Sequence, residues 1–539
     1  MKITLLAINA KYVHSSLAVW YLAGGIHHHD VSVTEATINQ NMNDIVERVV
    51  ENSPELIGIS TYIWNAGKLP DFLKKLRDRL PETVIVLGGP EATHNAEHWL
   101  TAADYVLGGE AEHTFPSLID AINKNCPEAL DNIPGLCFLK DGTARTNRPA
   151  ESAGEYVSPY SGEYYRELGG RIAYIETSRG CPFSCAYCLS GGSGIRFFPM
   201  DEMKKQIYKL TKSGTRTIKF VDRTFNCNAE RAYAMLEYIV GLDTECCFHI
   251  EAAADLFDER TLAVLNSAPI GRIQVEIGIQ SFNRKTLDIV SRKTDLKKAE
   301  TNIKKLLSSQ NIHVHVDLIA GLPYETLPIF EESFNRAYAI GAHTLQLGFL
   351  KLLHGSKLRE QAESLGITYK KEPPYEIISS SWLDENEFGI LKQTENAIQH
   401  TYNKGRFLSA LEYVLDASKL QPFELFRGLG RAVFNHATPL EKYAERIYGY
   451  FSGRSNVDGN ELRDRMICDL LGMTKGENMP AFLRSGGEKR KQVIITASRL
   501  LGRAIASHEA SVLSSGKGVY VDSTGRDAVT GLYKLHFID

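Results

Sequence analysis

The chain has 539 residues, of which 43% are hydrophobic and 23% are charged. This composition is typical of a folded protein with several domains and excludes a largely disordered chain. The net charge of -4 gives no general attraction to nucleic acid or to anionic membranes. No apolar run approaches the roughly 18 residues that span a bilayer. The nine cysteines are unevenly spread and no export signal precedes them, so we expect a reducing, cytoplasmic location.

Residues 1–150 alternate apolar strand segments with amphipathic helical segments. The pattern predicts an α/β, doubly wound, Rossmann-like domain whose ligands bind outside the carboxyl ends of the parallel strands. A hairpin is expected around the Asp141-Gly142 turn. Residues 151–169 are polar and rich in Gly, Ser and Tyr, and form the predicted linker. The predicted strands are 3–9, 31–38, 56–62, 83–89 and 104–109.

Residues 170–353 hold a second alternation of strands and helices. Six such units predict a curved, partly closed (β/α)6 barrel with its site at the carboxyl ends of the strands. Residues 354–539 are predicted to form a mainly helical domain, with a late strand pair within 518–538. The predicted barrel strands are 171–178, 217–224, 247–254, 272–280, 313–321 and 344–353.

The stretch TSRGCPFSCAYC places Cys181, Cys185 and Cys188 directly after the first predicted barrel strand. Zinc sites usually have four protein ligands and iron–sulfur clusters normally take four cysteines, yet no fourth Cys or His completes this local set. Three thiolates on a four-iron cluster would leave one iron open, which is useful only if a substrate or cofactor fills it. The alternatives are buried cysteines without metal, or a zinc site with a distant fourth ligand.

The Cys-x3-Cys-x2-Cys spacing resembles the cluster motif of the radical SAM superfamily, and the resemblance covers residues 170–353. It implies a [4Fe-4S] cluster whose open iron chelates S-adenosylmethionine. An electron from that cluster would release a 5'-deoxyadenosyl radical, which abstracts hydrogen from an unactivated position. By the same resemblance, Tyr187 would lie near the adenine. Cys227 is interpreted as a loop or core cysteine.

Four residues on later strands resemble the cosubstrate-binding pattern of a radical SAM subgroup that includes the anaerobic coproporphyrinogen enzyme and the methylthiotransferases. The resemblance implies that Glu251 and Arg292 hold the ammonium and carboxylate of S-adenosylmethionine. Gln280 and Asp317 would bond its ribose hydroxyls. Glu276 is either a further site residue or a partner in a structural salt bridge.

The glycine-rich strand ends GGPEAT and YVLGGEAE resemble those of the cobalamin-binding domain of B12-dependent radical SAM enzymes. Glycine lets a backbone approach a bulky ligand. The Asp-x-His-x-x-Gly motif that supplies a cobalt ligand in many B12 proteins is absent from the chain, so Tyr62 or Trp64 is interpreted as covering the lower cobalt face. The alternative is a domain that has lost its ligand. The predicted cobalamin-binding residues are Ser60, Thr61, Tyr62, Gly88, Gly89, Pro90, Gly108, Gly109 and Glu110.

The resemblance implies an enzyme, and the first hypothesis is a cobalamin-dependent methyltransferase acting on an unactivated carbon or phosphorus. S-adenosylmethionine would be both the methyl source and the radical source. One alternative is a cyclisation, rearrangement or oxidation that transfers no methyl group, and another is a non-catalytic iron–sulfur sensor or scaffold. A methylthiotransferase would need three more cysteines in the first domain, which holds only Cys126 and Cys137.

The sequence identifies neither the substrate, a small molecule or a peptide, nor a catalytic residue. We expect a reducing partner such as flavodoxin or ferredoxin and no membrane association. The basic stretch 484–503 is interpreted as a solvated helix face, so nucleic acid binding is not favoured. Residues 354–539 resemble the uncharacterised extension of one branch of B12-binding radical SAM proteins.

Overall fold

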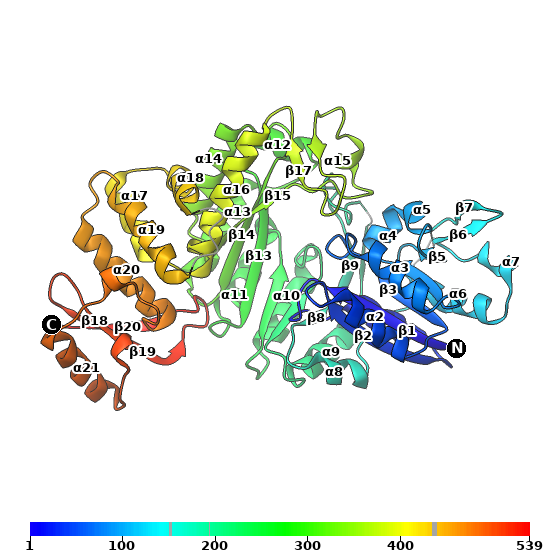
Figure 1. Ribbon diagram of the computed structural model, residues 1–539, viewed down its shortest axis with the longest axis horizontal. Coiled ribbons are helices and arrows are strands. Elements are labelled where there is room, and N and C mark those ends of the chain that lie inside the picture. Colours follow the sequence, from blue (N-terminus) through cyan, green and yellow to red (C-terminus); the bar gives the residue numbers. More distant parts are fainter. Residues whose placement is uncertain (150–153, 193, 434–438) are drawn as a thin grey trace. The chain divides into compact units, whose positions relative to one another are not determined.

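The computed structural model describes residues 1–149, 154–192, 194–433 and 439–539 (Figure 1). Its internal contacts divide the chain into two compact units, which are considered separately below. Unit 1 comprises Met1–Phe225, Gly241–Ile250 and Lys351–Ile377, and unit 2 comprises Asn226–Val240, Glu251–Leu350 and Ile378–Asp539. Within the described residues, no helix has the length and apolar character that a membrane span requires.

The first sheet, in unit 1, has seven strands in the order β2-β1-β3-β4-β5-β6-β7. The first five strands pair in parallel, and β6 and β7 add an antiparallel hairpin at one edge. The chain reverses its direction of winding between β1 and β3, and doubly wound sheets bind ligands at such a switch point. The predicted doubly wound sheet and hairpin are confirmed. The strands are β1 (Lys2–Asn9), β2 (Asp30–Thr37), β3 (Leu56–Ser60), β4 (Val84–Gly88), β5 (Tyr105–Leu107), β6 (Leu136–Lys140) and β7 (Thr143–Thr146).

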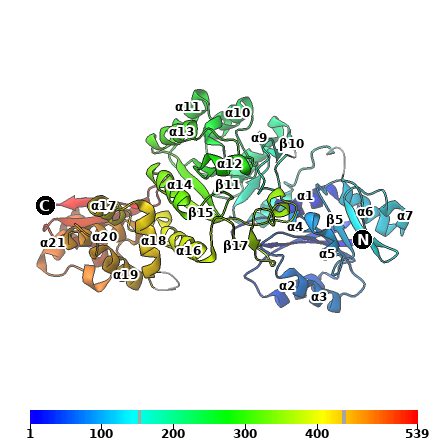
Figure 2. The ribbon, with the colours of Figure 1, turned by 90° about the horizontal axis from the view of Figure 1, so that it is seen from above.

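Helices cover both faces of this sheet. In Figure 2, α2 and α3 lie on one side of the sheet and α1 and α6 on the other. Seven of the eight residues of β1 are buried, as expected for a strand packed on both faces. Its core includes Leu6, Ile8 and the apolar stripes of α2 and α3. The helices are α1 (Leu17–Gly25), α2 (Met42–Glu51), α3 (Leu69–Arg79), α4 (Pro90–His94), α5 (Ala96–Trp99), α6 (Thr114–Asn123) and α7 (Pro127–Leu130).

The predicted linker is partly structured. Residues 151–153 lie outside the described residues. Helix α8 (Gly162–Leu168) follows, capped by Ser161, whose side chain accepts a hydrogen bond from Tyr164 N–H. Tyr164 and Leu168 are buried, so the end of the predicted linker packs into unit 1.

The second sheet has six strands in the order β15-β14-β13-β12-β11-β8, which confirms the predicted parallel barrel strands. In unit 1, β11 pairs in parallel with β8 and β12; in unit 2, β14 pairs in parallel with β13 and β15. The strand predicted over 171–178 is interrupted after Ile175, and a new strand begins at Ser178. The strands are β8 (Ala173–Ile175), β11 (Thr217–Phe220), β12 (Cys247–Glu251), β13 (Ile273–Gln280), β14 (His313–Ala320) and β15 (Thr344–Phe349).

Strands β13 and β14 alternate fully buried and half-buried residues along their whole length. This alternation is the pattern of a sheet with one packed face and one face turned toward an interior with room for ligands. Helices follow each strand, as a βα repeat requires. They are α9 (Met200–Thr211), α10 (Ala229–Val240), α11 (Glu259–Asn266), α12 (Arg284–Ile289), α13 (Leu296–Ser308) and α14 (Leu327–Ala339).

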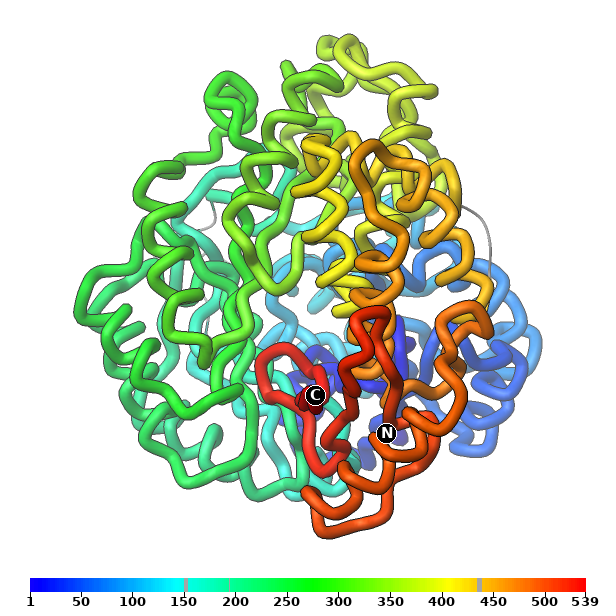
Figure 3. Tube along the Cα trace, turned by 90° about the vertical axis from the view of Figure 1, so that its left-hand side faces the viewer, coloured from blue at the N-terminus to red at the C-terminus, as the bar shows by residue number. Residues whose placement is uncertain are grey.

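The C-terminal region is mainly helical, as predicted, and ends in a small antiparallel sheet. The predicted strand pair is present as β19 (Gly518–Arg526) and β20 (Tyr533–Ile538), and β18 (Ala510–Val512) adds a third strand. Val493 and Ala497 of the last helix pack against Tyr520 of this sheet. The C-terminal segment that holds this helix and sheet is the dark orange to red part of the trace in Figure 3. The helices are α16 (Glu385–His400), α17 (Leu408–Ser418), α18 (Pro422–Val433), α19 (Leu440–Ser452), α20 (Gly459–Thr474) and α21 (Glu488–Leu501).

His343, in unit 2, predicts a dependence of stability on pH. Its Nδ1 accepts a hydrogen bond of 3.1 Å from Val314 N–H, so the ring must be neutral in the native state. Burial, with the neighbouring His313, lowers the pKa of His343 to about 4, against an opposing effect of Asp527. Because the unfolded chain binds this proton more readily, the contribution is present above about pH 6.5 and lost as the pH falls toward 4.

We therefore expect the wild-type protein to unfold at a lower temperature at pH 5 than at pH 7. A His343→Asn variant keeps an acceptor without titrating, so the difference between pH 7 and pH 5 should shrink. The measurement is the thermal midpoint at both pH values. An equal shift in the two proteins would show that His343 does not cause it.

Candidate functional site

The three cysteines lie on a hairpin loop in unit 1. Strand β9 (Ser178–Cys181) pairs antiparallel with β10 (Gly194–Phe197), which places Cys181 opposite Gly194 at the base of the loop. Cys188 N–H donates to Cys185 O at 3.0 Å. None of the three cysteines is in a disulfide bond; Cys181 and Cys185 are buried and Cys188 is half-buried. The structure thus places the three predicted cysteines on one short hairpin loop.

Three cysteines on one short loop are a donor set of the kind that iron–sulfur clusters take. In the described part of the chain, no three Cys, His, Asp or Glu side chains are grouped so that they could hold a metal ion as they stand. In a four-iron cluster each thiolate binds a different iron, so the ligands are spaced more widely than around a single ion. Among the donors, Cys188 Sγ also accepts from Ser190 N–H at 3.4 Å, a contact of the kind that tunes cluster thiolates.

Asp222, which the sequence analysis did not single out, fixes the start of this loop. It follows β11 and is 2% exposed. Its carboxylate accepts from Thr177 N–H at 3.0 Å, Thr177 Oγ1 at 2.7 Å and Ser178 Oγ at 2.5 Å. Burial raises the pKa of Asp222, against the effect of these donors. These bonds explain why the predicted strand breaks at Thr177, since its backbone N–H turns to Asp222 instead of to a neighbouring strand.

Arg179 joins the cysteine loop to the first sheet. Its guanidinium forms ion pairs with Glu112 at 2.7 Å, with Glu110 at 3.0 Å and with Glu176 at 2.6 Å. Glu110 also pairs with Arg196, which lies opposite Arg179 in the hairpin, at 2.6 Å. The side chain of Arg179 is only 20% exposed, so these pairs are less screened than surface pairs.

The loops after β3, β4 and β5 hold the predicted cobalamin residues, but several side chains have internal roles. Thr61 Oγ1 donates to Gly88 O at 2.6 Å and accepts from Ala92 N–H at 3.0 Å. Gly89 has a φ of 99°, and a Cβ there would lie 2.5 Å from Thr61 O. Both residues therefore pack two neighbouring loops together, and their contact with cobalamin stays a prediction.

In the loop after β5, some predicted residues also make internal contacts, while one has a backbone that faces open space. Gly108 N–H donates to Gly135 O at 2.9 Å, which ties the loop to the start of the hairpin, just before β6. Gly109, with a φ of 78°, has nothing within 4 Å of the position of a Cβ, so its backbone faces open space. The carboxylate of Glu110 is engaged by two arginines. Ser60 is buried, and Pro90 begins α4.

Tyr62 and Trp64 form a flat aromatic surface at the carboxyl end of β3. Their rings stack with centroids 4.2 Å apart and planes within 7°. Trp64 Nε1 donates to Ile8 O at 3.2 Å, and the Trp64 ring is 41% exposed. Burial raises the pKa of the Tyr62 hydroxyl, which is therefore neutral. Exposed aromatic rings beside the switch point of the sheet suit contact with a large planar ligand.

In unit 2, the structure brings together three of the predicted cosubstrate residues. Asp317 lies on β14 in register with Gly278 of β13, and the strand bulges between Gly278 and Gln280. Arg292 donates from Nη2 to Gly278 O. A Cβ at Gly278 would stand 2.1 Å from Gln280 Nε2, so glycine is required where these side chains meet. Tyr187 is half-buried between Cys185 and Cys188, and Glu251 is the last residue of β12.

Gln280 has the features of a ligand-binding residue. Its φ of 71° lies in the left-handed region, which costs a residue with a side chain roughly 1–2 kcal/mol. Its amide Oε1 is buried without a hydrogen-bond partner among the residues that the structure describes. Buried polar atoms are almost always bonded, so an unbonded one indicates a missing ligand or water.

Gln280→Gly therefore separates stability from binding. Glycine adopts this φ without strain, so the thermal midpoint should not fall, while S-adenosylmethionine binding should weaken at least about tenfold through loss of the amide. Calorimetric titration with S-adenosylmethionine measures the second effect. Gln310→Gly, at a φ of 54° in a turn, is the matched control and should leave binding unchanged. Unchanged affinity in Gln280→Gly would remove Gln280 from the site.

Glu325 was also missed by the sequence analysis. It follows the Gly-Leu-Pro turn after β14, is fully buried, and accepts from Ser281 Oγ at 2.5 Å and Ser333 Oγ at 3.3 Å. Burial raises the pKa of Glu325 to about 7. Since Ser281 directly follows Gln280, this carboxyl group supports the strained end of β13. Ser281 lies 44 residues from Glu325 in sequence, so no local pattern links the two.

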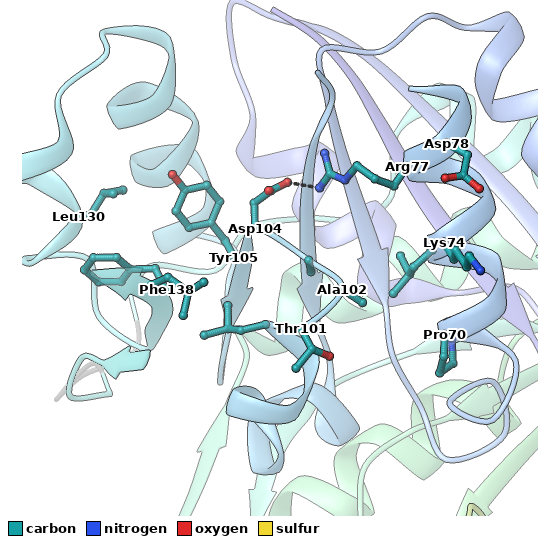
Figure 4. Close-up of a pocket in the computed structure, with 14 residues that line it drawn as sticks. Pro70, Lys74, Arg77, Asp78, Thr101, Ala102, Asp104, Tyr105, Leu130 and Phe138 are labelled. Carbon is teal, nitrogen blue, oxygen red and sulfur yellow. Dashed lines mark hydrogen bonds and ion pairs between the residues drawn. The ribbon is translucent and has the colours of Figure 1, made fainter. Parts of the chain in front are cut away.

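A surface hollow of about 630 Å³ in unit 1 lies away from these residues (Figure 4). It borders the entry to β5, where Arg77 and Asp104 form an ion pair of 2.7 Å, and not the carboxyl ends of the strands. None of the predicted site residues lines it. It is therefore not the candidate site.

Three family models match the chain in succession. They are the B12 binding domain over residues 3–119, the radical SAM superfamily over 175–337, and a family of unknown function, DUF4080, over 363–510. The first two coincide with the sheet that carries the Tyr62–Trp64 surface and with the strands that flank the cysteine loop.

Relatives and solved structures with the same architecture are distant in sequence. An uncharacterized methyltransferase of Pyrococcus horikoshii, PH0819, is 24% identical over 365 residues, covering 64% of this chain and 78% of the relative. TokK of Streptomyces tokunonensis, a cobalamin-dependent radical SAM methyltransferase, is 22% identical over 443 residues, covering 77% of this chain and 64% of TokK. The structure of the cobalamin-dependent S-adenosylmethionine radical enzyme OxsB with aqua-cobalamin and S-adenosylmethionine bound aligns with a TM-score of 0.63 at 15% identity, covering 86% of this chain and 78% of OxsB.

At these identities the structural likeness establishes the fold, and the family models define the domains. The sequence-based recognition is confirmed at the level of domains: the chain carries a B12-binding domain, a radical SAM domain and, after them, a DUF4080 region.

Proposed function

We propose that this protein is a cobalamin-dependent radical SAM methyltransferase. One observation carries the proposal: Arg179, two residues before Cys181, is ion-paired with Glu110 and Glu112 in the loop after β5. The loop for an iron–sulfur cluster and the ligand-binding edge of a B12-type sheet are thereby joined within one unit. An enzyme that uses the two cofactors together requires this arrangement.

The residues present suit the proposed cofactors. Cys181, Cys185 and Cys188 would hold the [4Fe-4S] cluster as thiolates. S-adenosylmethionine would be bound by Tyr187, Glu251, Gln280, Arg292 and Asp317. Once bound, the cluster supplies the electron that cleaves the sulfonium and cobalamin carries the methyl group. Gln280 Oε1 would accept a ribose hydroxyl, and Arg292 would pair with the carboxylate.

For cobalamin, the proposal differs from the residue list that the sequence suggested. The backbone at Gly109 and the exposed ring of Trp64 would contact the corrin, while Thr61, Gly89 and Glu110 shape the loops around it. The Trp64 indole would exclude water from the bound cobalamin and would offer it no strong donor atom, because the indole N–H only donates.

The test uses protein purified without oxygen and reconstituted with iron, sulfide and hydroxocobalamin. A low-potential reductant and S-adenosylmethionine are then added, and S-adenosylhomocysteine and 5'-deoxyadenosine are measured. S-adenosylhomocysteine that forms only with cobalamin present supports methyl transfer. 5'-Deoxyadenosine alone would instead favour the non-methylating alternative, and a preparation that retains no iron would contradict both.

We further propose a reducing protein partner of the flavodoxin or ferredoxin type, because the electron must come from outside the chain. A reducing compartment fits the nine cysteines of the chain, none of which is in a disulfide bond in the structure. The substrate class is left open by the residues described above.

A further inference from the structure

Residues 351–377, here called the strap, fold back on themselves in unit 1. Lys351 and Glu376 form an antiparallel bridge, and Leu352 N–H donates to Tyr375 O at 2.9 Å. The strap holds the short helix α15 (Lys357–Glu360), capped by the buried Ser356, and a two-residue strand, β16 (Thr368–Tyr369). The sequence analysis placed this segment in the helical C-terminal domain, whereas its contacts group it with the cysteine loop and the first sheet.

The strap contacts the loops of both predicted cofactor sites. Tyr375 Oη donates to Glu91 Oε1 at 2.5 Å. Glu91 follows Pro90 in α4, the short helical turn after β4. Gly355, with a φ of 81°, lies so close to His94 of the same turn that a Cβ would stand 2.2 Å from its Nδ1. At the other end, Leu358 N–H donates to Ala186 O, within the cysteine loop, at 2.9 Å. One folded segment therefore holds two turns that are 90 or more residues apart in sequence.

The Tyr375–Glu91 bond is buried and polar, so its loss would be costly. Tyr375 is 4% exposed and Glu91 is 5% exposed. Burial raises the pKa of Glu91, and the tyrosine hydroxyl opposes that effect by stabilising the carboxylate. Removing one partner of a buried hydrogen bond leaves the other without compensation for its lost hydration.

Other strap residues keep Tyr375 in place. Arg359 stacks between the rings of Tyr369, at 5.1 Å, and Tyr375, at 4.9 Å. The ring of His354 meets Tyr375 edge to face at 5.0 Å. Burial and the nearby Arg359 lower the pKa of His354 to about 4, so the ring is neutral at pH 7. Tyr375 is thus aimed at Glu91 by a packed cluster.

We propose that the strap is a positioning element that fixes the turn after β4 relative to the cysteine loop, with Tyr375 and Glu91 as positioning residues. The inference rests on the proposed function, since these two turns border the proposed cobalamin and cluster sites. It assigns a role to the segment in which the DUF4080 match begins: residues 363–377 of that match belong to the cofactor unit, while the rest of the match lies in unit 2.

The test compares Tyr375→Phe with Tyr369→Phe in the full chain. Tyr369→Phe is the matched control because it removes a hydroxyl from the same strap and keeps the ring against Arg359. Hydrogen exchange of peptides covering residues 86–94 should be faster in Tyr375→Phe than in wild type or control. Hydroxocobalamin, titrated spectroscopically, should bind about tenfold more weakly to Tyr375→Phe. Glu91→Gln retains an acceptor oxygen for the Tyr375 hydroxyl. Its affinity for hydroxocobalamin should therefore stay within about twofold of that of wild type.

The two readouts separate this inference from the proposed function. If wild-type protein binds no hydroxocobalamin, the proposed function fails, while hydrogen exchange still decides whether the strap orders the turn. Exchange in Tyr375→Phe that equals wild type overturns the strap proposal. So does faster exchange with unchanged hydroxocobalamin affinity, because the contact would then stabilise the turn without positioning a cofactor.

Discussion

Replacing any one of Cys181, Cys185 and Cys188 by alanine is expected to leave the protein without a stable iron–sulfur cluster. Each thiolate would hold a separate iron, so the loss of one leaves that iron without its protein ligand. Wild type should retain about four iron atoms per chain after anaerobic reconstitution, and each variant much less. Production of 5'-deoxyadenosine should fall below detection, since the cosubstrate would lose its iron and its electron source together.

Cys126→Ala is the control for this series. Cys126 is an exposed thiol of unit 1, away from the loop, and its replacement should change neither iron content nor 5'-deoxyadenosine formation. Iron, sulfide and zinc are measured together on the same samples. A single-cysteine variant that kept its iron, or wild-type protein that carried zinc and no sulfide, would contradict the assignment of the loop.

The fold was predictable because its pattern is local. Continuous apolar strands such as β1, alternating with amphipathic helices such as α2, indicate a parallel sheet packed on both faces. The cysteine loop was found for the same reason, since its three ligands lie within eight residues of sequence. Turn residues such as Gly142 marked the hairpin correctly.

Long-range contacts were not predictable from spacing. Asp222 reaches Thr177 across 45 residues, Arg179 reaches Glu112 across 67, and Tyr375 reaches Glu91 across 284. No periodicity links such pairs. The strap shows the consequence most clearly: its sequence was interpreted as the start of a helical domain, while its contacts belong to the first unit.

Residue roles were less predictable than residue positions. The sequence placed Thr61 and Gly89 correctly near strand ends, but it did not show their contacts. In the structure, Thr61 donates a hydrogen bond to Gly88 O, and Gly89 packs closely against Thr61 O. Gln280 was expected at the end of its strand, yet its left-handed backbone was not, because glutamine has no preference for that conformation. Such strain is visible only in a structure, where it indicates a position that the surrounding fold enforces.

Asp222→Asn should weaken cluster retention even though all three cysteines remain. The carboxylate accepts three hydrogen bonds from Thr177 and Ser178, and an asparagine NH2 group would oppose one of those donors. Leaving a buried donor unbonded costs about 1–3 kcal/mol, enough to disorder the start of the loop locally. We expect severalfold less iron per chain after reconstitution and faster loss of iron to a chelator.

Asp243→Asn, an exposed change in the same unit, controls for the lost charge and should retain iron like wild type. Ser178→Ala removes only one of the three bonds and should fall between wild type and Asp222→Asn. Such a graded series links iron retention to the number of bonds that hold Thr177 and Ser178, and so to loop order. If Asp222→Asn instead kept its iron while unfolding at a lower temperature, Asp222 would stabilise the sheet alone, and the cysteine loop would be ordered by its hairpin and Arg179.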